Sequence, residues 1–174
     1  RHRRHTSRTP PAKHTSKPHT KEDHVASPSL SWHFRGVDAT TSTDARPAVI
    51  ITTADRAKEL KTPLVTIRGI GVFNDTSKSW QLTPGGPRSS ALIAGKLAYE
   101  MAGLSPKDIG AAQIYDCYTY TVEATLADYR FYDRKKSRDF RTRQNTGPGG
   151  AFPVTPAGGP PAERHYLGPT PLPR

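Results

Sequence analysis

Short β-branched runs alternate with helix-forming stretches in the middle of the chain, and this alternation most constrains the fold. The runs at 48–52 and 64–72 are rich in Val, Ile and Thr, as is typical of buried strands. Between them, 53–60 contains good helix formers after Thr53, a residue type suited to a helix N-cap. Strands separated by helices predict helices layered on a sheet, so we expect an α/β fold.

The clearest helix is predicted for residues 89–101. Ile93, Leu97 and Met101 recur every fourth residue, which places them on one side of a helix. Gly103 follows in the position where a glycine commonly ends a helix.

A turn, a strand and a second long helix are expected to follow. Ser105 and Pro106 suit the start of a short helical turn. Residues 111–115 read as a strand, and 119–129 have apolar residues at helical spacing. The α/β alternation therefore continues through the second half of the chain.

The two ends of the chain differ from this middle part in composition. Residues 1–24 are rich in His, Ser, Thr and basic residues and predict a solvated, disordered basic tail. Their histidines lack the spacing of a metal site, so we expect no metal. Residues 169–174 form a Pro-rich tail. The usable core is therefore expected within about 47–168.

A second basic run, at 134–143, accounts with the tail for nearly all of the net charge of +11. Three interpretations are open: a solvated loop, attraction of phosphate groups, or nucleic-acid binding. Phe140 is the one aromatic residue within the run, which provides no stacking platform. We therefore rank the solvated loop first and nucleic acid last.

Cysteine content and hydropathy bound the class of protein. The single cysteine excludes an intrachain disulfide framework, and no apolar run reaches the length of a membrane span. No signal peptide is recognisable at the N-terminus. We expect a soluble, cytoplasmic protein with no membrane partner. Because the first residue is Arg, we also expect a missing upstream part.

A candidate reaction site is centred on Tyr115-Asp116-Cys117-Tyr118. Glycine-rich runs follow at 147–150 and 157–159, and glycines allow backbone amides to approach a ligand closely. Cys117 has two interpretations: a thiol activated at a helix N-terminus, or a small packing residue. Asp116 is interpreted as a cap of the following helix or as an acid catalyst, with the cap ranked first.

These pieces, in this order, resemble the C-terminal half of thiolase-like proteins. The motifs that carry the resemblance are Thr-Ala-Asp-Arg-Ala at 53–57, the segment 98–109, Tyr-Asp-Cys-Tyr-Thr at 115–119 and the double-glycine loop. The branch is that of the sterol-carrier or lipid-transfer proteins, which includes acetyl-CoA acetyltransferase-like proteins and aldolases of steroid side-chain degradation.

The resemblance implies a domain organisation and a fold. Residues 25–61 would be a remnant of the thiolase N-terminal half, and 62–168 the C-terminal-like domain. The fold would be an incomplete, thiolase-like layered α/β/α half-fold with a mixed sheet. The half that carries the family's nucleophilic cysteine is largely absent.

The resemblance also implies site residues. Tyr115 occupies the place of a family His and favours proton donation, because a phenol with an ordinary pKa near 10 is a poor base. His165 falls on the family's catalytic His, and Tyr166 matches a Tyr variant after a shift of one residue. Cys117 completes the candidate catalytic group. The glycines expected against the ligand are Gly149, Gly150, Gly158 and Gly159.

The implied function is action on acyl-CoA thioesters, as an acyltransferase or in retro-aldol cleavage, with coenzyme A as part of the substrate and no bound cofactor. The chain is expected to need an N-terminal half or a partner, as a homodimer or in a hetero-complex. The alternative is a non-catalytic module that binds CoA esters or a partner, with nucleic-acid binding ranked last.

Overall fold

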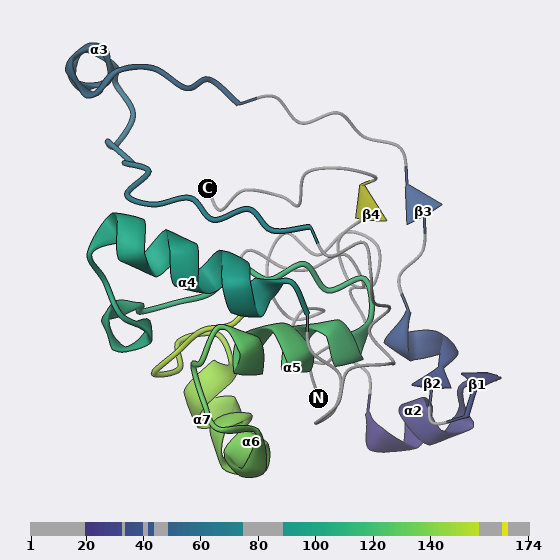
Figure 1. Cartoon of the computed structure of the whole chain (residues 1–174). Helices are drawn as coiled ribbons and strands as arrows, with labels where there is room; N and C mark the ends of the chain where they lie inside the picture. The colour runs from purple at the N-terminus through teal and green to yellow at the C-terminus, as the bar shows by residue number, and fades with distance from the viewer. Residues whose placement is uncertain are drawn as a thin grey trace.

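The computed structural model describes residues 20–32, 34–39, 42–43, 49–74, 89–156 and 165–166, with only the backbone given for 42–43 and 165–166. Figure 1 shows the helices of residues 91–102 and 119–128 stacked at the centre. A small N-terminal unit, residues 20–32 and 34–39, lies at one end, and the short helices of residues 134–146 lie below. Helices and strands are α2 Lys21–Ala26, β1 Ser29–Ser31, β2 Phe34–Arg35, η1 Gly36–Asp38, β3 Ser42–Thr43, α3 Ala54–Lys58, α4 Ala91–Ala102, η2 Pro106–Asp108, α5 Thr119–Asp128, η3 Arg134–Lys136, α6 Ser137–Phe140, α7 Arg143–Thr146 and β4 His165–Tyr166.

The expected helices are present, and α4 packs on α5. Gly103 ends α4 in the left-handed conformation, at φ 66°, as its position in the sequence predicted. Gly95 brings α4 against the ring of Tyr129, where a Cβ atom would overlap the ring carbons. The Tyr99 hydroxyl donates a hydrogen bond of 3.1 Å to the Tyr129 carbonyl. The end of α5 is thereby fixed to the middle of α4.

The hydrophobic core lies beneath α5. Val122 and Leu126 of α5 pack against the segment around Ala112 and against the chain near Val154. The aromatic residues that pack around this core are Tyr129, Phe131, Tyr132 and Phe152. The core is small, so the position of α5 depends on a few contacts.

The strand predicted at 111–115 is reduced to one parallel bridge, between Ala112 and Val154. The Ala112 N–H donates to the Pro153 carbonyl at 3.0 Å, and the Thr155 N–H donates to the Ala112 carbonyl at 2.7 Å. Burial alternates along this segment as in a strand, because Ala112 and Ile114 are buried and Tyr115 is exposed. The segment therefore has the alternating burial of a strand, but its pairing is limited to this single bridge.

The strands predicted at 48–52 and 64–72 are not formed in the described part of the chain. Residues 49–52 and 64–72 are neither helical nor paired as strands, and their large side chains are exposed, as at Val65 (88%). A strand needs a hydrogen-bonded neighbour. Among the described residues, 64–72 has helix α4 as its neighbour instead, and Figure 1 shows it running beside that helix.

Two glycines allow this segment to lie directly on α4. A Cβ atom on Gly69 would overlap the carbonyl oxygen of Ala98, and one on Gly71 would overlap that of Ala94. The Ile70 N–H also donates to the Met101 sulfur at 3.3 Å. The small side chains of α4 therefore face the segment.

The large apolar residues of α4 are not buried as the four-residue spacing suggested. Ile93 and Leu97 are each 42% exposed and Met101 is 65% exposed. Val65 and Ile67, in the segment that runs beside α4, are exposed as well, and we call these five exposed side chains the open apolar surface. The helix was predicted correctly, but the described residues do not cover this side of it.

The N-terminal unit begins within the segment predicted to be a disordered tail. Residues 20–24 belong to α2 and its cap, whereas 1–19 lie outside the described residues. Thr20 and Asp23 form a capping box, with the Asp23 N–H donating to Thr20 Oγ1 at 3.1 Å and the Thr20 N–H donating to Asp23 at 2.8 Å. Strands β1 and β2 then pair antiparallel, and the backbones of β3 and β4 pair parallel. The molecule is thus an incomplete α/β domain with short sheets.

A buried carboxylate joins α5 to the start of α4. Asp128 accepts hydrogen bonds from the Ser89 N–H at 2.6 Å and from the Ser89 hydroxyl at 2.8 Å. Arg134 Nη2 forms an ion pair with its other oxygen at 2.6 Å. A charge that would be unfavourable alone in the interior is therefore surrounded by donors.

The basic run folds into η3, α6 and α7 rather than an open loop. Two of its cations have acidic partners: Arg134 pairs with Asp128, and Arg141 pairs with Glu123 at 2.8 Å. Lys135 and Lys136 are exposed to solvent. Within the described part of the chain, no helix is both long and apolar enough to cross a membrane.

Candidate active site

The segment Tyr115-Asp116-Cys117-Tyr118 leads directly into α5. Tyr115 is 42% exposed and Asp116 is completely buried, so the strand-like alternation continues as far as Asp116, and the exposed Tyr118 departs from it. An antiparallel bridge between Tyr118 and Ala39 fixes the segment to the N-terminal unit. Core and N-terminal unit together hold the predicted site residues in place.

The phenol of Tyr115 lies beside the thiol of Cys117. Partial burial raises the pKa of Tyr115, and the adjacent Cys117, which forms a hydrogen bond with the phenol, raises it further. The nearby Asp116 and Tyr118 act in the same direction. Tyr115 therefore carries its proton at neutral pH.

Cys117 is half-buried at the N-terminal end of α5. Its sulfur lies 3.7 Å from the hydroxyl oxygen of Thr121, one turn into the helix. The Thr121 hydroxyl in turn donates to the Tyr118 carbonyl at 2.6 Å. The thiol thus contacts a phenol and a hydroxyl, and both interpretations of Cys117 are compatible with this position.

The prediction that Asp116 caps α5 is wrong. The N-cap residue is Tyr118, whose backbone is extended and whose side chain makes no capping hydrogen bond. Asp116 instead alternates with its neighbours and points into the interior. Helix α5 starts at Thr119 as predicted, so its N-cap position falls on Tyr118, two residues after the buried Asp116.

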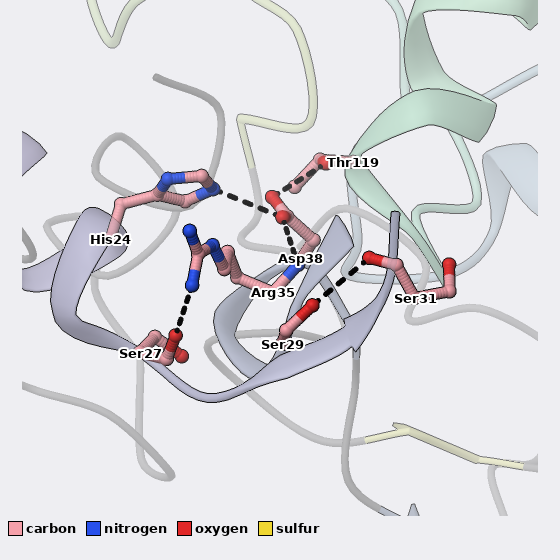
Figure 2. A network of polar contacts seen from close by, with 7 residues as sticks. All are labelled: His24, Ser27, Ser29, Ser31, Arg35, Asp38 and Thr119. Atoms are coloured by element: carbon pink, nitrogen blue, oxygen red, sulfur yellow. Dashed lines mark hydrogen bonds and ion pairs between the residues drawn. The ribbon is translucent and has the colours of Figure 1, made fainter. Parts of the chain in front are cut away.

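An acidic network outside the predicted site braces the start of α5 (Figure 2). Asp38, 8% exposed, accepts hydrogen bonds from the Arg35 N–H at 2.9 Å and the Thr119 hydroxyl at 3.0 Å. His24 Nε2 lies 3.0 Å from its Oδ2 atom. One carboxylate therefore connects α2, η1 and the first residue of α5.

The hydrogen bonds to Asp38 outweigh the cost of its burial. Burial alone raises the pKa of this carboxyl group, but the donors from Arg35, His24 and Thr119 hold the pKa below its usual value. Asp38 is consequently ionised at neutral pH, where a negative charge at the start of α5 complements the helix dipole. This network was not predicted, because His24 falls in the segment predicted to be a tail; the capping-box spacing of Thr20 and Asp23 was the available signal.

Two of the predicted ligand-facing glycines have structural roles as well. Gly149 is left-handed, at φ 74°, and a Cβ atom on Gly150 would overlap the carbonyl oxygen of Asn145. The Gly150 N–H donates to the Gly147 carbonyl at 2.9 Å. The tight turn thus accounts for both glycines without a ligand.

The remaining predicted residues are described in part or not at all. Gly158 and Gly159 lie outside the described residues. The backbones of His165 and Tyr166 form β4, which pairs with Ser42 and Thr43 of β3. Among the predicted catalytic residues whose side chains the structure describes, Tyr115 and Cys117 lie together.

Comparisons with known proteins agree with this geometry. A family model described as "Thiolase C-terminal domain-like" matches residues 74–172. The chain is 27% identical over 170 residues to the 17-hydroxy-3-oxo-4-pregnene-20-carboxyl-CoA lyase of Mycobacterium tuberculosis. It is 28% identical over 170 residues to the steroid side-chain-cleaving aldolase of Thermomonospora curvata. Each alignment covers 95% of this chain and 44% of the relative.

Two further relatives extend this pattern. An acetyl-CoA acetyltransferase of Methanocaldococcus jannaschii is 27% identical over 164 residues, covering 87% of this chain and 40% of the relative. Among solved structures, a chain of the Ltp2-ChsH2(DUF35) aldolase superposes with a TM-score of 0.79 at 27% identity. That match covers 94% of this chain and 44% of the other. The chain therefore spans less than half the length of the relatives it matches.

Proposed function

Because this chain belongs to the thiolase C-terminal domain-like family, as its sequence motifs predicted, we propose that it contributes to retro-aldol cleavage of an acyl-CoA thioester. The acyl group in this proposal is a steroid side chain, because the names of two relatives, 27% and 28% identical to this chain, describe cleavage of steroid compounds. The observation that carries the proposal is the protonated, partly exposed phenol of Tyr115 next to Cys117.

The chemistry of a retro-aldol cleavage needs a base and an oxyanion donor. The substrate is a thioester with a hydroxyl group on its β-carbon. A base removes the hydroxyl proton, the bond between the α- and β-carbons breaks, and its electron pair forms the enolate of the shortened thioester. A proton then returns to the α-carbon, which gives a ketone and a shorter acyl-CoA.

Tyr115 is suited to the enolate step. A phenol that keeps its proton can donate a hydrogen bond to the thioester oxygen as negative charge develops there. The reaction forms no acyl-enzyme, so Cys117 can support Tyr115 without acting as a nucleophile. We assign the base to His165 or Tyr166, and we place Gly149, Gly150, Gly158 and Gly159 along the thioester, with coenzyme A entering as part of the substrate.

We further propose that the open apolar surface is covered by a second polypeptide or by the other half of a longer chain. The surface includes Ile93, Leu97 and Met101 of α4 with Val65 and Ile67 beside it, and exposed apolar patches mark interaction sites. Relatives more than twice as long, and a solved aldolase whose description names two components, support a hetero-complex. In this proposal 25–61 belongs with the N-terminal half of the family's fold, and 62–168 is the C-terminal domain.

This partner proposal predicts the effect of a charge on the surface. Val65→Asp is expected to weaken co-purification of the chain with its partner by about tenfold or more, because an ion would be buried without a counter-ion. Val25→Asp, at an exposed valine of α2, is the matched control and should leave assembly unchanged. Equal assembly of both variants, by analytical ultracentrifugation, would remove this surface from the interface.

Product analysis of the assembled protein tests the function. A synthetic steroid thioester with a β-hydroxyl group should yield a ketosteroid and a shortened acyl-CoA, without added free coenzyme A. Mass spectrometry of the reaction identifies both products. Cleavage that requires free coenzyme A and releases acetyl-CoA would instead assign thiolytic acyl transfer, the activity class of the acetyl-CoA acetyltransferase relatives, and would contradict the proposal.

A further inference from the structure

A cavity of about 350 Å³ lies between the β1–β2 hairpin and the start of α5. Leu30 and Phe34 line it from the hairpin, and Tyr118 and Tyr120 line it from the helix. The Phe34 and Tyr120 rings meet edge to face, with centroids 6.2 Å apart. Ligand sites span about 300–1,000 Å³, so this cavity suits one rigid apolar group rather than a whole coenzyme A thioester.

The charged residues of the cavity are Arg35 and Asp38, and Ser31 lines it as well. Asp38 already receives hydrogen bonds from the Arg35 N–H, the Thr119 hydroxyl and His24. Arg35 Nη1 donates to the Ser27 carbonyl at 3.1 Å, as Figure 2 shows, and a guanidinium has four further N–H donors. Because the charges of Arg35 and Asp38 are opposite and lie side by side, the cavity favours the binding of neither an anion nor a cation. The matching ligand group is an uncharged acceptor, such as a ketone or hydroxyl oxygen.

The cavity shares a wall with the candidate active site. Tyr118 lines it, pairs with Ala39 through a bridge and follows Tyr115 by three residues. A rigid group in the cavity would therefore lie beside the segment that carries the phenol. The Asp38 network fixes both sides of the cavity, since it joins η1 to Thr119 at the start of α5.

We propose that this cavity binds the apolar ring system of the acyl group, with an uncharged oxygen of the ligand accepting a hydrogen bond from Arg35. The inference rests on the proposed function for its substrate class, but its test needs no turnover. The probe is 4-androstene-3,17-dione, an uncharged fused-ring steroid with a ketone oxygen at each end, which carries no coenzyme A.

Equilibrium dialysis of the radiolabelled steroid against the full chain measures the binding. Leu30→Trp fills the cavity from an exposed position and should weaken binding by about tenfold or more. Leu64→Trp places the same ring at an exposed leucine outside the cavity and should bind as the parent does. Absence of saturable binding to the parent chain, or equal affinity of both variants, would overturn the inference.

A second variant tests the polar end without filling the cavity. Arg35→Gln is expected to weaken steroid binding by about three- to tenfold, through loss of one hydrogen bond to an uncharged acceptor. Unchanged affinity in a variant with a parent-like far-ultraviolet circular dichroism spectrum would contradict the role of Arg35. Steroid binding without cleavage of the thioester would refute the proposed function and leave the cavity assignment standing. Cleavage of the thioester without steroid binding in the cavity would support the proposed function and refute the cavity assignment.

Discussion

Tyr115→Phe is expected to lower kcat for thioester cleavage by about 10²–10³-fold in the assembled protein, the range for loss of one oxyanion donor. The substitution removes only the hydroxyl group, so packing at this partly exposed position should persist. KM should change little, because the donor acts mainly on the charge that develops during the reaction. Steady-state kinetics with the steroid thioester measures both quantities.

The pH profile gives an independent check on this role. Burial and the adjacent Cys117 raise the pKa of Tyr115, so the donor should keep its proton until the pH exceeds the ordinary tyrosine value near 10. The high-pH loss of activity assigned to Tyr115 should accordingly lie above that value, and Tyr115→Phe should abolish this limb. Tyr99→Phe, which removes a phenol hydroxyl of α4 outside the site and the cavity, is the matched control. Equal losses in kcat for the two variants would show that Tyr115 is not the donor.

Asp128→Ala is expected to produce the largest loss of stability, about 3 kcal/mol in the free energy of unfolding. The change removes a nearly buried carboxylate that accepts from Ser89 and pairs with Arg134. These donors lose their partner, and the start of α4 is released from the end of α5. Urea unfolding followed by circular dichroism measures the difference.

A matched control separates burial from charge. Asp139→Ala removes an exposed carboxylate of α6 and should change the free energy of unfolding by less than about 0.5 kcal/mol. If the two variants lose the same stability, the Asp128 network does not hold the helices together. A loss confined to Asp128→Ala would support its structural role.

Local signals were enough to predict the two long helices, α4 and α5, but not α2, α6 or α7. Gly103 ends α4 as expected, and α5 appears where apolar residues recur at helical spacing. The strands failed because a β-branched run specifies an extended backbone, whereas pairing depends on a second segment elsewhere in the fold. At 64–72 the described neighbour is the small-residue side of α4, which the spacing of Ile93, Leu97 and Met101 did not reveal.

The site could be predicted only where it is continuous in sequence. Tyr115 and Cys117 are two residues apart, and the structure brings the phenol and the thiol together. The partnership of His24, Asp38 and Thr119 links residues far apart in the chain, and no local pattern specifies it. Long-range polar contacts of this kind follow from the packing of whole elements.

The alternation through 114–117 has an evolutionary consequence. Because Tyr115 faces outward and Asp116 inward, insertion or deletion of one residue ahead of this segment would bury the phenol and expose the carboxylate. Most single substitutions nearby do not change which of these side chains face outward and which face inward. The length of the connection from η2 to α5 should accordingly vary less among functional descendants than the identity of its residues. Insertion or deletion of two residues should be tolerated more readily than insertion or deletion of one.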